Sequence, residues 1–157
     1  MQEFENVEKI TEMLRSHVER ALQELWEDPE LTIDDDGDYP FRSDTAAGWI
    51  RVIGGEQPAV CVFAKAATGV PSTKKVLEEI AELNARSRWA KISWCHGDVV
   101  VDEAIHWLSL DQAALARAIE SVMTVSDDIG SMIATVYGGQ TPFPLDLEAA
   151  SSDEDAA

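Results

Sequence analysis

The fold is decided by two apolar runs on either side of a short polar turn, in the stretch KISWCHGDVVVD at residues 91–102. Its apolar and β-branched side chains are typical of strands, and His96-Gly97 can form the two-residue turn of a tight hairpin. With that turn, Lys91 falls opposite Asp102, which is a favourable cross-strand pair of opposite charges. We therefore expect two antiparallel strands, over residues 89–95 and 99–107.

The region before this hairpin predicts three further strands joined by short turns. They are rich in β-branched and aromatic residues and cover residues 39–42, 47–53 and 59–66. Pro40 has no N–H group to donate to a neighbouring strand, so the first strand should lie at an edge of the sheet. Short turns join antiparallel neighbours, so the chain predicts one antiparallel sheet of five strands.

Three stretches with apolar residues at helical spacing predict helices. The first covers residues 3–28, and the second runs from a cap at Ser72 or Thr73 to residue 87. The last should begin at the capping box Ser109–Gln112 and end at Gly138-Gly139, with a bend or fraying near Gly130.

The resulting order, α-β-β-β-α-β-β-α, predicts an α+β fold with an antiparallel five-stranded sheet and helices packed mainly on one face. We expect one domain over residues 3–139. Residues 140–157 are acidic, aperiodic and rich in small residues, so we expect them to form a disordered tail.

Alternation along the strands predicts two unequal faces of the sheet. One is apolar and should be the core face, covered by the first and last helices, although Glu103 falls on it unless a bulge shifts the register. The other mixes aromatic and basic side chains and would be open to solvent in a two-layer fold, unless the second helix covers it. Six residues of this second face are the candidate partner-binding residues: Trp49, Arg51, Phe63, Lys65, Trp89 and Lys91.

The formal net charge is −18, from 30 acidic and 12 basic residues. Such a surface repels nucleic acid and anionic membranes, because phosphate binding depends on lysine and arginine. It suits either simple solubility or attraction to a basic partner. The acidic opening of the chain does not resemble a signal peptide, and no apolar run reaches the ~20 residues of a membrane span. We therefore expect a cytoplasmic protein.

Catalytic and metal-binding motifs are incomplete in this sequence. Asp34, Asp36 and Asp38 have the first spacings of a calcium loop, but the glycine and the final glutamate of an EF-hand are missing. We interpret this stretch as a solvated acidic turn. The histidines and cysteines lack zinc-ligand spacing, and Cys61 and Cys95 should be reduced, with a disulfide left open if their strands are neighbours. We expect no cofactor, no metal and no catalytic residue.

Several short motifs, taken in order, resemble the YbjN family, whose fold is similar to that of type III secretion chaperones of the CesT type. The matching motifs are Asp36-Gly37-Asp38, Trp49-Ile50-Arg51-Val52, Leu83-Asn84, Lys91-Ile92-Ser93-Trp94 and Tyr137-Gly138-Gly139. The resemblance implies an α+β domain, often dimeric, that holds a partner peptide in extended form. It supplies no catalytic residues.

The leading hypothesis is a non-catalytic chaperone or adaptor that binds another polypeptide, of unknown identity, and forms a homodimer. The alternative is an acidic immunity-type or inhibitor protein that binds a basic protein. A hydrolase that uses the acids Asp34–Asp38 is the weakest hypothesis, because no activating base accompanies them.

Overall fold

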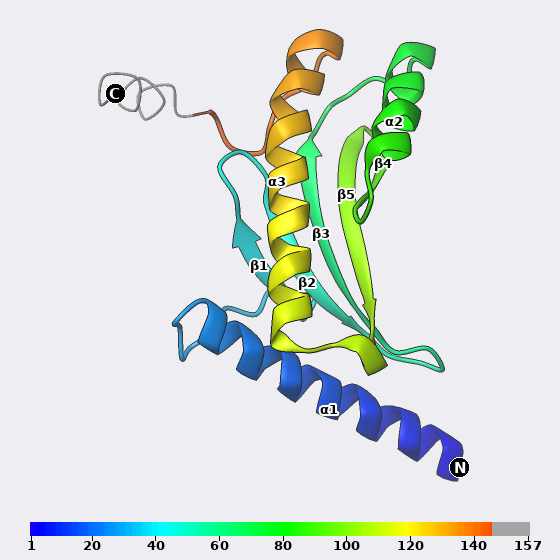
Figure 1. Cartoon of the computed structure of the whole chain (residues 1–157), viewed down its shortest axis with the longest axis vertical. Helices are drawn as coiled ribbons and strands as arrows, with labels where there is room; N and C mark the ends of the chain where they lie inside the picture. Colours follow the sequence, from blue (N-terminus) through cyan, green and yellow to red (C-terminus); the bar gives the residue numbers. More distant parts are fainter. Residues whose placement is uncertain (146–157) are drawn as a thin grey trace.

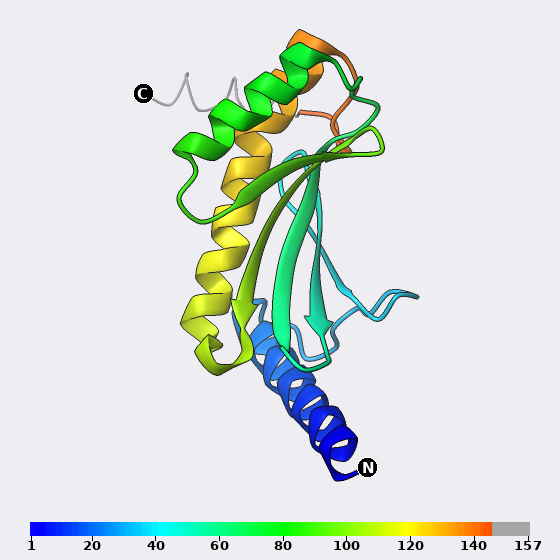
Figure 2. The ribbon, with the colours of Figure 1, turned by 90° about the vertical axis from the view of Figure 1, so that its right-hand side faces the viewer.

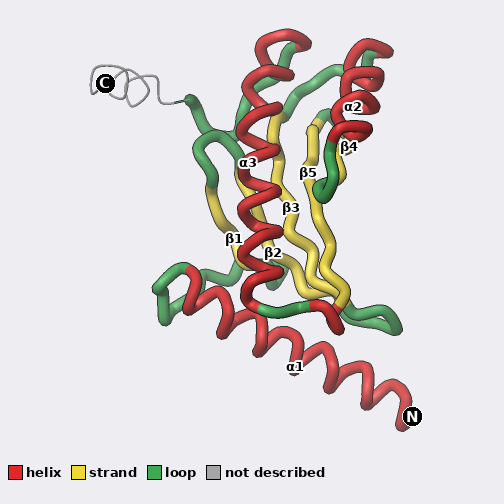
Figure 3. The backbone as a smooth tube through the Cα atoms, in the orientation of Figure 1, coloured by secondary structure: helices red, strands yellow, loops and turns green. Residues whose placement is uncertain are grey.

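The protein was analysed as a computed structural model that describes residues 1–145. Three α-helices and five strands follow in the predicted order (Figure 1, Figure 3). The helices are α1 Gln2–Leu25, α2 Lys74–Arg86 and α3 Gln112–Tyr137, and the short 3₁₀ turn η1 Trp107–Ser109 precedes α3. The strands are β1 Tyr39–Arg42, β2 Ala47–Ile53, β3 Ala59–Ala67, β4 Lys91–Cys95 and β5 Asp98–His106.

The five strands form one antiparallel sheet in the order β1-β2-β3-β5-β4, which confirms the predicted fold class. The β4–β5 hairpin closes on Cys95 opposite Asp98, and Lys91 lies opposite Asp102 as expected. His96 and Gly97 both have positive φ, 49° and 91°, as the turn best suited to the twist of a two-residue hairpin requires. Pro40 lies in β1, which is an edge strand, also as expected.

The helices pack mainly on one side of this sheet (Figure 2). α3 runs along β3 and β5, α2 packs beside β4, and α1 crosses the end of the sheet near β2 (Figure 1). Between helices and sheet lies a core of buried apolar side chains that includes Leu22, Ile50, Val62, Val101 and Leu115. The expected core face is therefore confirmed, with α2 as an additional cover at the β4 side.

α3 differs from the expectation at its start and at its glycine. Its N-cap is Asp111, whose Oδ1 accepts a hydrogen bond of 2.7 Å from the backbone N–H of Ala114, so the capping box at Ser109 was wrong. The helix is also continuous through Gly130, where a bend or fraying was expected. A Cβ atom at this position would lie 2.3 Å from the carbonyl oxygen of Ala66, so the glycine allows α3 to approach β3 closely.

The segment after α3 remains against the domain. Gln140 forms an isolated antiparallel bridge with Thr68, and the N–H of Phe143 donates a hydrogen bond of 3.0 Å to the carbonyl of Thr45. Packing therefore extends beyond residue 139, where the domain was expected to end. Residues 146–157 of the expected tail lie outside the described residues.

One carboxylate fastens the β1–β2 turn to α3. Asp127 of α3 accepts hydrogen bonds from the Ser43 hydroxyl (2.6 Å), from the Thr45 hydroxyl and N–H (3.0 Å each) and from the N–H of Asp44 (3.3 Å). Ser43 and Thr45 are buried, so water cannot replace this acceptor without a rearrangement of the turn.

Replacing Asp127 by alanine should therefore destabilise the protein. The loss of a charged acceptor from several buried donors predicts a decrease of about 2–3 kcal/mol in the free energy of unfolding, measured by urea denaturation. Asp128→Ala, one residue further along the same helix at an exposed position, is the control, with an expected change within about 0.5 kcal/mol. Equal effects of the two substitutions would contradict this assignment.

A second polar contact joins β1 to α1. The hydroxyl of the buried Tyr39 donates a hydrogen bond of 2.6 Å to Glu19, and Arg15 donates one of 3.1 Å to the same hydroxyl. Burial, and next the bond to Glu19, raises the pKa of Tyr39 from 10.0 to about 12. The folded protein therefore favours the protonated phenol.

This pKa predicts how stability changes at high pH. A raised pKa in the folded state contributes stability below pH 10.0, and that contribution is lost as the pH rises towards about 12. We expect Tyr137→Phe, which leaves Tyr39 as the single tyrosine, to lose stability over this interval more steeply than Tyr39→Phe/Tyr137→Phe does. Parallel losses in urea denaturation would show that Tyr39 is not responsible.

Candidate functional site

No helix within residues 1–145 covers the second face of the sheet. Along β2, β3 and β5, the side chains on the helix side are buried, whereas those of the second face are half-buried or exposed. α2 does not cover this face, because it packs beside β4 on the same side of the sheet as α3 (Figure 2). The alternative in which the second helix shields these residues is therefore wrong. We call this surface the open face.

Four of the six candidate residues meet at one shallow hollow on the open face. Trp49 and Phe63 are cross-strand partners with stacked rings, at a centroid distance of 5.5 Å and an interplanar angle of 22°. The Arg51 guanidinium lies 5.0 Å from the centre of the Phe63 ring. With Lys65, Asp36 and Asp38, these residues line a hollow of about 210 Å³.

Arg51, Lys65 and Lys91 are each paired with an acid. Arg51 forms a two-pronged ion pair with the buried Asp38, with its shortest N–O distance at 2.5 Å, and this bond raises the pKa of Arg51. The ammonium of Lys65 lies 3.0 Å from a carboxylate oxygen of Asp98. Lys91 is likewise paired, with Asp102 at 3.3 Å. The open face therefore presents aromatic rings among balanced charges, rather than a positive patch.

Trp89 lies apart from this group. It precedes β4 in the chain, is 61% exposed, and lies under Arg117 of α3, whose guanidinium is 4.9 Å from its ring centre. The strand was expected to begin at residue 89 but begins at Lys91, because the Ser87 hydroxyl bonds the carbonyl of Ala90 and holds a turn there. Lys91 is also distant in the sheet, since β5 separates β4 from β3.

The same arginine explains the acidic residue on the core face. Arg117 donates a hydrogen bond of 2.7 Å to Glu103, which is buried on the helix side of β5. The β3–β5 register is continuous past Glu103, and its irregularity lies between Lys65 and Ala67. A bulge, which could have turned Glu103 to the other face, is therefore not present there, and Oε1 of the buried carboxylate is paired with Arg117 instead.

The two edges of the sheet differ in accessibility. At β4, the side-chain amide of Asn84 from α2 accepts from the N–H of Ile92 (2.8 Å) and donates to its carbonyl (2.6 Å), as an added strand would. At β1, β2 is the only strand partner among residues 1–145. In the sequence, Asn84 belongs to the Leu83-Asn84 motif of the predicted second helix, and no local pattern indicates that it blocks an edge.

The acidic loop and the cysteines have structural explanations. Oδ1 of Asp34 accepts bonds from the N–H groups of Asp36 (3.0 Å) and Asp38 (2.9 Å), so the loop is an Asx-type turn held by its own side chain. Both cysteines are free, and β5 lies between the strands that carry them. Burial raises the pKa of the Cys61 thiol, which lies on the open face.

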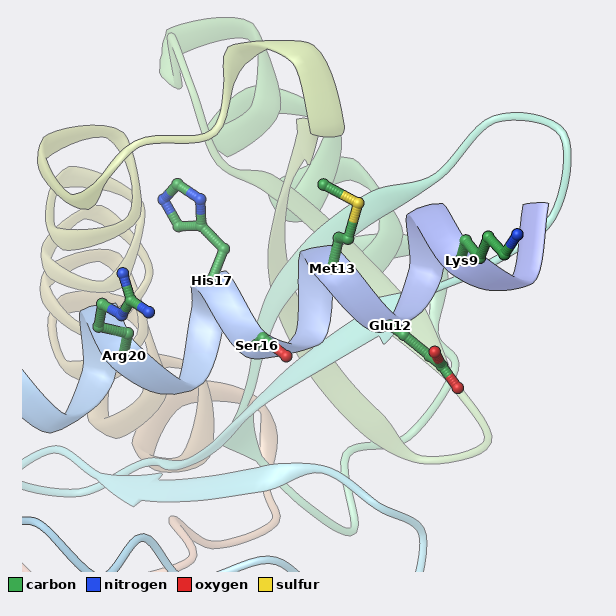
Figure 4. Close-up of a pocket in the computed structure, with 6 residues that line it drawn as sticks. All are labelled: Lys9, Glu12, Met13, Ser16, His17 and Arg20. Atoms are coloured by element: carbon green, nitrogen blue, oxygen red, sulfur yellow. The ribbon is translucent and has the colours of Figure 1, made fainter. Parts of the chain in front are cut away.

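Another hollow lies along α1 and has a volume of about 620 Å³. Figure 4 shows its six lining residues, all from this one helix, with Met13 and His17 projecting from one side and Glu12 from the other. These side chains do not converge on a common point, as an acid, a base and a nucleophile would have to do. The arrangement indicates an exposed helix surface.

These features define a class of protein: a small α+β domain in which residues 1–145 leave one sheet face and one sheet edge uncovered, which suits the binding of polypeptide. The sequence matches, over residues 12–145, the family TY-Chap1, described as T3SS (YopN, CesT) and YbjN peptide-binding chaperone 1. The chain belongs to this family of peptide-binding chaperones, and the resemblance to YbjN proteins is confirmed. No curated protein matches the sequence.

Solved structures share the fold at low sequence identity. The ExsC–ExsE complex gives a TM-score of 0.61 at 15% identity, covering 75% of this chain and 94% of that chain. The HopA1–SchA chaperone–effector complex gives 0.60 at 13%, covering 74% and 92%. The Yersinia pestis type III secretion chaperone SycH, in complex with a fragment of YscM2, gives 0.54 at 17%, covering 76% and 98%.

One further observation concerns membranes. None of the helices within residues 1–145 combines the length and the apolarity that a membrane crossing requires.

The edge-blocking role of Asn84 can be tested directly. Asn84→Ala should leave the N–H and C=O of Ile92 without protein partners, at an expected cost of about 1–2 kcal/mol in the free energy of unfolding. The amide of Ile92 should also exchange faster with deuterium. Glu82→Ala, an exposed residue of the same helix, is the control. Unchanged exchange at Ile92 would show that its amide is protected by something other than Asn84.

Proposed function

We propose that the protein is a non-catalytic chaperone or adaptor that binds an extended segment of another polypeptide along β1, with the open face contacting its side chains. The observation that carries this proposal is the sheet itself. In a member of a peptide-binding chaperone family, one face of the sheet and one of its two edges remain uncovered by the described residues.

The edge supplies the backbone part of this interaction. A segment that pairs with β1 would satisfy the outward N–H and C=O groups of that strand, as in strand addition to other sheets. Pro40 removes one donor from β1, which limits the number of hydrogen bonds but leaves the outward-pointing carbonyls available.

The open face supplies the side-chain part. In the β1–β2 register Pro40 lies opposite Trp49, which in turn stacks on Phe63. Alternate side chains of an added strand would therefore project beside an apolar surface that begins at the edge. Aromatic rings of this kind contribute large contact areas in interfaces, whereas the charged groups beside them are already paired within the chain.

The comparisons support this proposal by analogy. Two of the similar structures are described as complexes of a chaperone with an effector or with a protein fragment. We extend to this chain only the general mode of action, in which a chaperone holds another polypeptide. The identity of that polypeptide is not part of the proposal.

Two further expectations belong with this function. We expect the protein to act in the cytoplasm and to form a homodimer, for which light scattering is the direct measurement.

The net charge of −18 is the observation that favours the second candidate, an acidic inhibitor of a basic protein. Membership in a family of peptide-binding chaperones favours the chaperone. The two candidate functions differ in the form of the partner, because the chaperone would bind it as an extended segment.

The two tryptophans provide a matched pair for the test. Trp49 lies on the open face and Trp89 on the helix side under Arg117. For a polypeptide partner identified by mass spectrometry of native complexes, Trp49→Ala should weaken binding by about tenfold or more, because aromatic anchors dominate such contacts. Trp89→Ala should change it little. Equal effects of the two substitutions would contradict binding at the open face.

Cys61 reports the occupancy of the same face. In Cys95→Ser it is the single thiol, and its partial burial should make its reaction with a maleimide slow but measurable. Bound partner should slow it further. An unchanged rate with saturating partner would place the partner elsewhere on the molecule.

A further inference from the structure

A groove of about 370 Å³ lies where the end of α1 meets α3. Five apolar side chains form its floor and walls: Leu25, Trp26, Ala116, Ile119 and Met123. Thr124 and three acidic residues complete the lining. The groove is distinct from the open face, because it lies on the helix side of the sheet.

The groove borders the open edge of the sheet. The Trp26 ring lies 6.5 Å from that of Phe41 in β1, with an interplanar angle of 45°. Leu25, Trp26, Phe41 and Met123 pack against the core from one side and remain partly exposed on the other. An apolar surface therefore extends from β1 into the groove without cover from any described residue.

The charges at this groove are of one sign. Asp44, Glu120 and Asp127 line it, and no lysine or arginine does. Asp44 and Glu120 are exposed, whereas Asp127 accepts the hydrogen bonds of the β1–β2 turn. The hollow on the open face differs, because there Asp38 is paired with Arg51.

We propose that this groove receives a bulky apolar side chain of the bound polypeptide, with lysine or arginine two residues to either side of it, because in an extended segment those side chains point to the same side of the sheet. The inference rests on the proposed function and specifies the class of polypeptide. Burial of an apolar side chain against the floor would stabilise the complex, and so would the attraction between the carboxylates of the rim and the cations of the polypeptide. An acidic segment would be repelled by the same rim and by a chain with a net charge of −18.

Strand geometry connects this groove with the open face. Successive side chains of an extended segment on β1 point to opposite sides of the sheet. One set would lie over the open face beside Trp49, and the other would point to the helix side, where Phe41 and Trp26 lead into the groove. One extended segment can therefore contact both surfaces, with alternate side chains on the open face and on the side of the groove.

The test uses three fluorescent synthetic peptides of equal length. In the first, lysine or arginine stands two residues before and two residues after a central phenylalanine, with leucine at the positions between; in the second, glutamate replaces the cations; in the third, serine replaces them. We expect fluorescence anisotropy to show binding of the basic peptide, at least tenfold weaker binding of the neutral one, and none of the acidic one. Added salt should weaken binding of the basic peptide more than binding of the neutral one, because salt screens the attraction between charges.

A pair of threonine substitutions on α3 locates the interaction. Thr124 is exposed, so Thr124→Arg places a cation within the rim without unfolding the protein. It should weaken binding of the basic peptide by about tenfold. Thr135→Arg makes the same change at an exposed position of the same helix outside the groove, and should weaken binding by about twofold at most through general charge.

The outcomes separate this inference from the proposed function. If Trp49→Ala weakens peptide binding but Thr124→Arg and Thr135→Arg change it equally, the groove is not involved and the open face still binds the peptides. Equal binding of all three peptides would also overturn the inference while leaving the function intact. If no peptide binds and a native partner is insensitive to both Trp49→Ala and Thr124→Arg, both proposals fail.

Discussion

The close approach of α3 to β3 is the contact on which the rest of the structure depends. Gly130 brings the helix backbone against the carbonyl of Ala66, and Asp127, one turn earlier, fastens the β1–β2 turn to the same helix. Because α3 covers the centre of the sheet from one side, the apolar side chains of β2, β3 and β5 are buried on that side. The chain then has no described helix left for the other face, which remains available to a partner.

The two edges of the sheet determine where another strand can be added. An exposed edge is a site of unwanted association unless it is blocked or used. Here Asn84 occupies the backbone groups of Ile92 at β4, whereas β1 carries only Pro40 as a partial block. A polypeptide that adds to this sheet would therefore meet β1, with aromatic rings on one side and the acid-rimmed groove on the other. Binding in this account depends on shape, backbone pairing and charge.

Local patterns were sufficient to predict the element order, the hairpin turn at His96-Gly97 and the edge position of Pro40, because each depends on residues near one another in the chain. The open face was predicted from strand alternation, and Trp49, Arg51, Phe63 and Lys65 do meet on it. Trp89 was misplaced, because parity cannot show where a strand begins. Long-range contacts such as Arg117 with Glu103, and the groove between α1 and α3, have no local signal and required the structure.

The central claim is that a partner polypeptide occupies the β1 edge and the adjoining open face. Hydrogen–deuterium exchange of the protein, with and without a polypeptide isolated from its native complexes, tests this claim most directly. The account predicts slower exchange on binding in the segments that contain Tyr39–Arg42 and Ala47–Ile53, and little change in Lys91–Cys95. Protection confined to β4 and α2, with β1 unaffected, would contradict it.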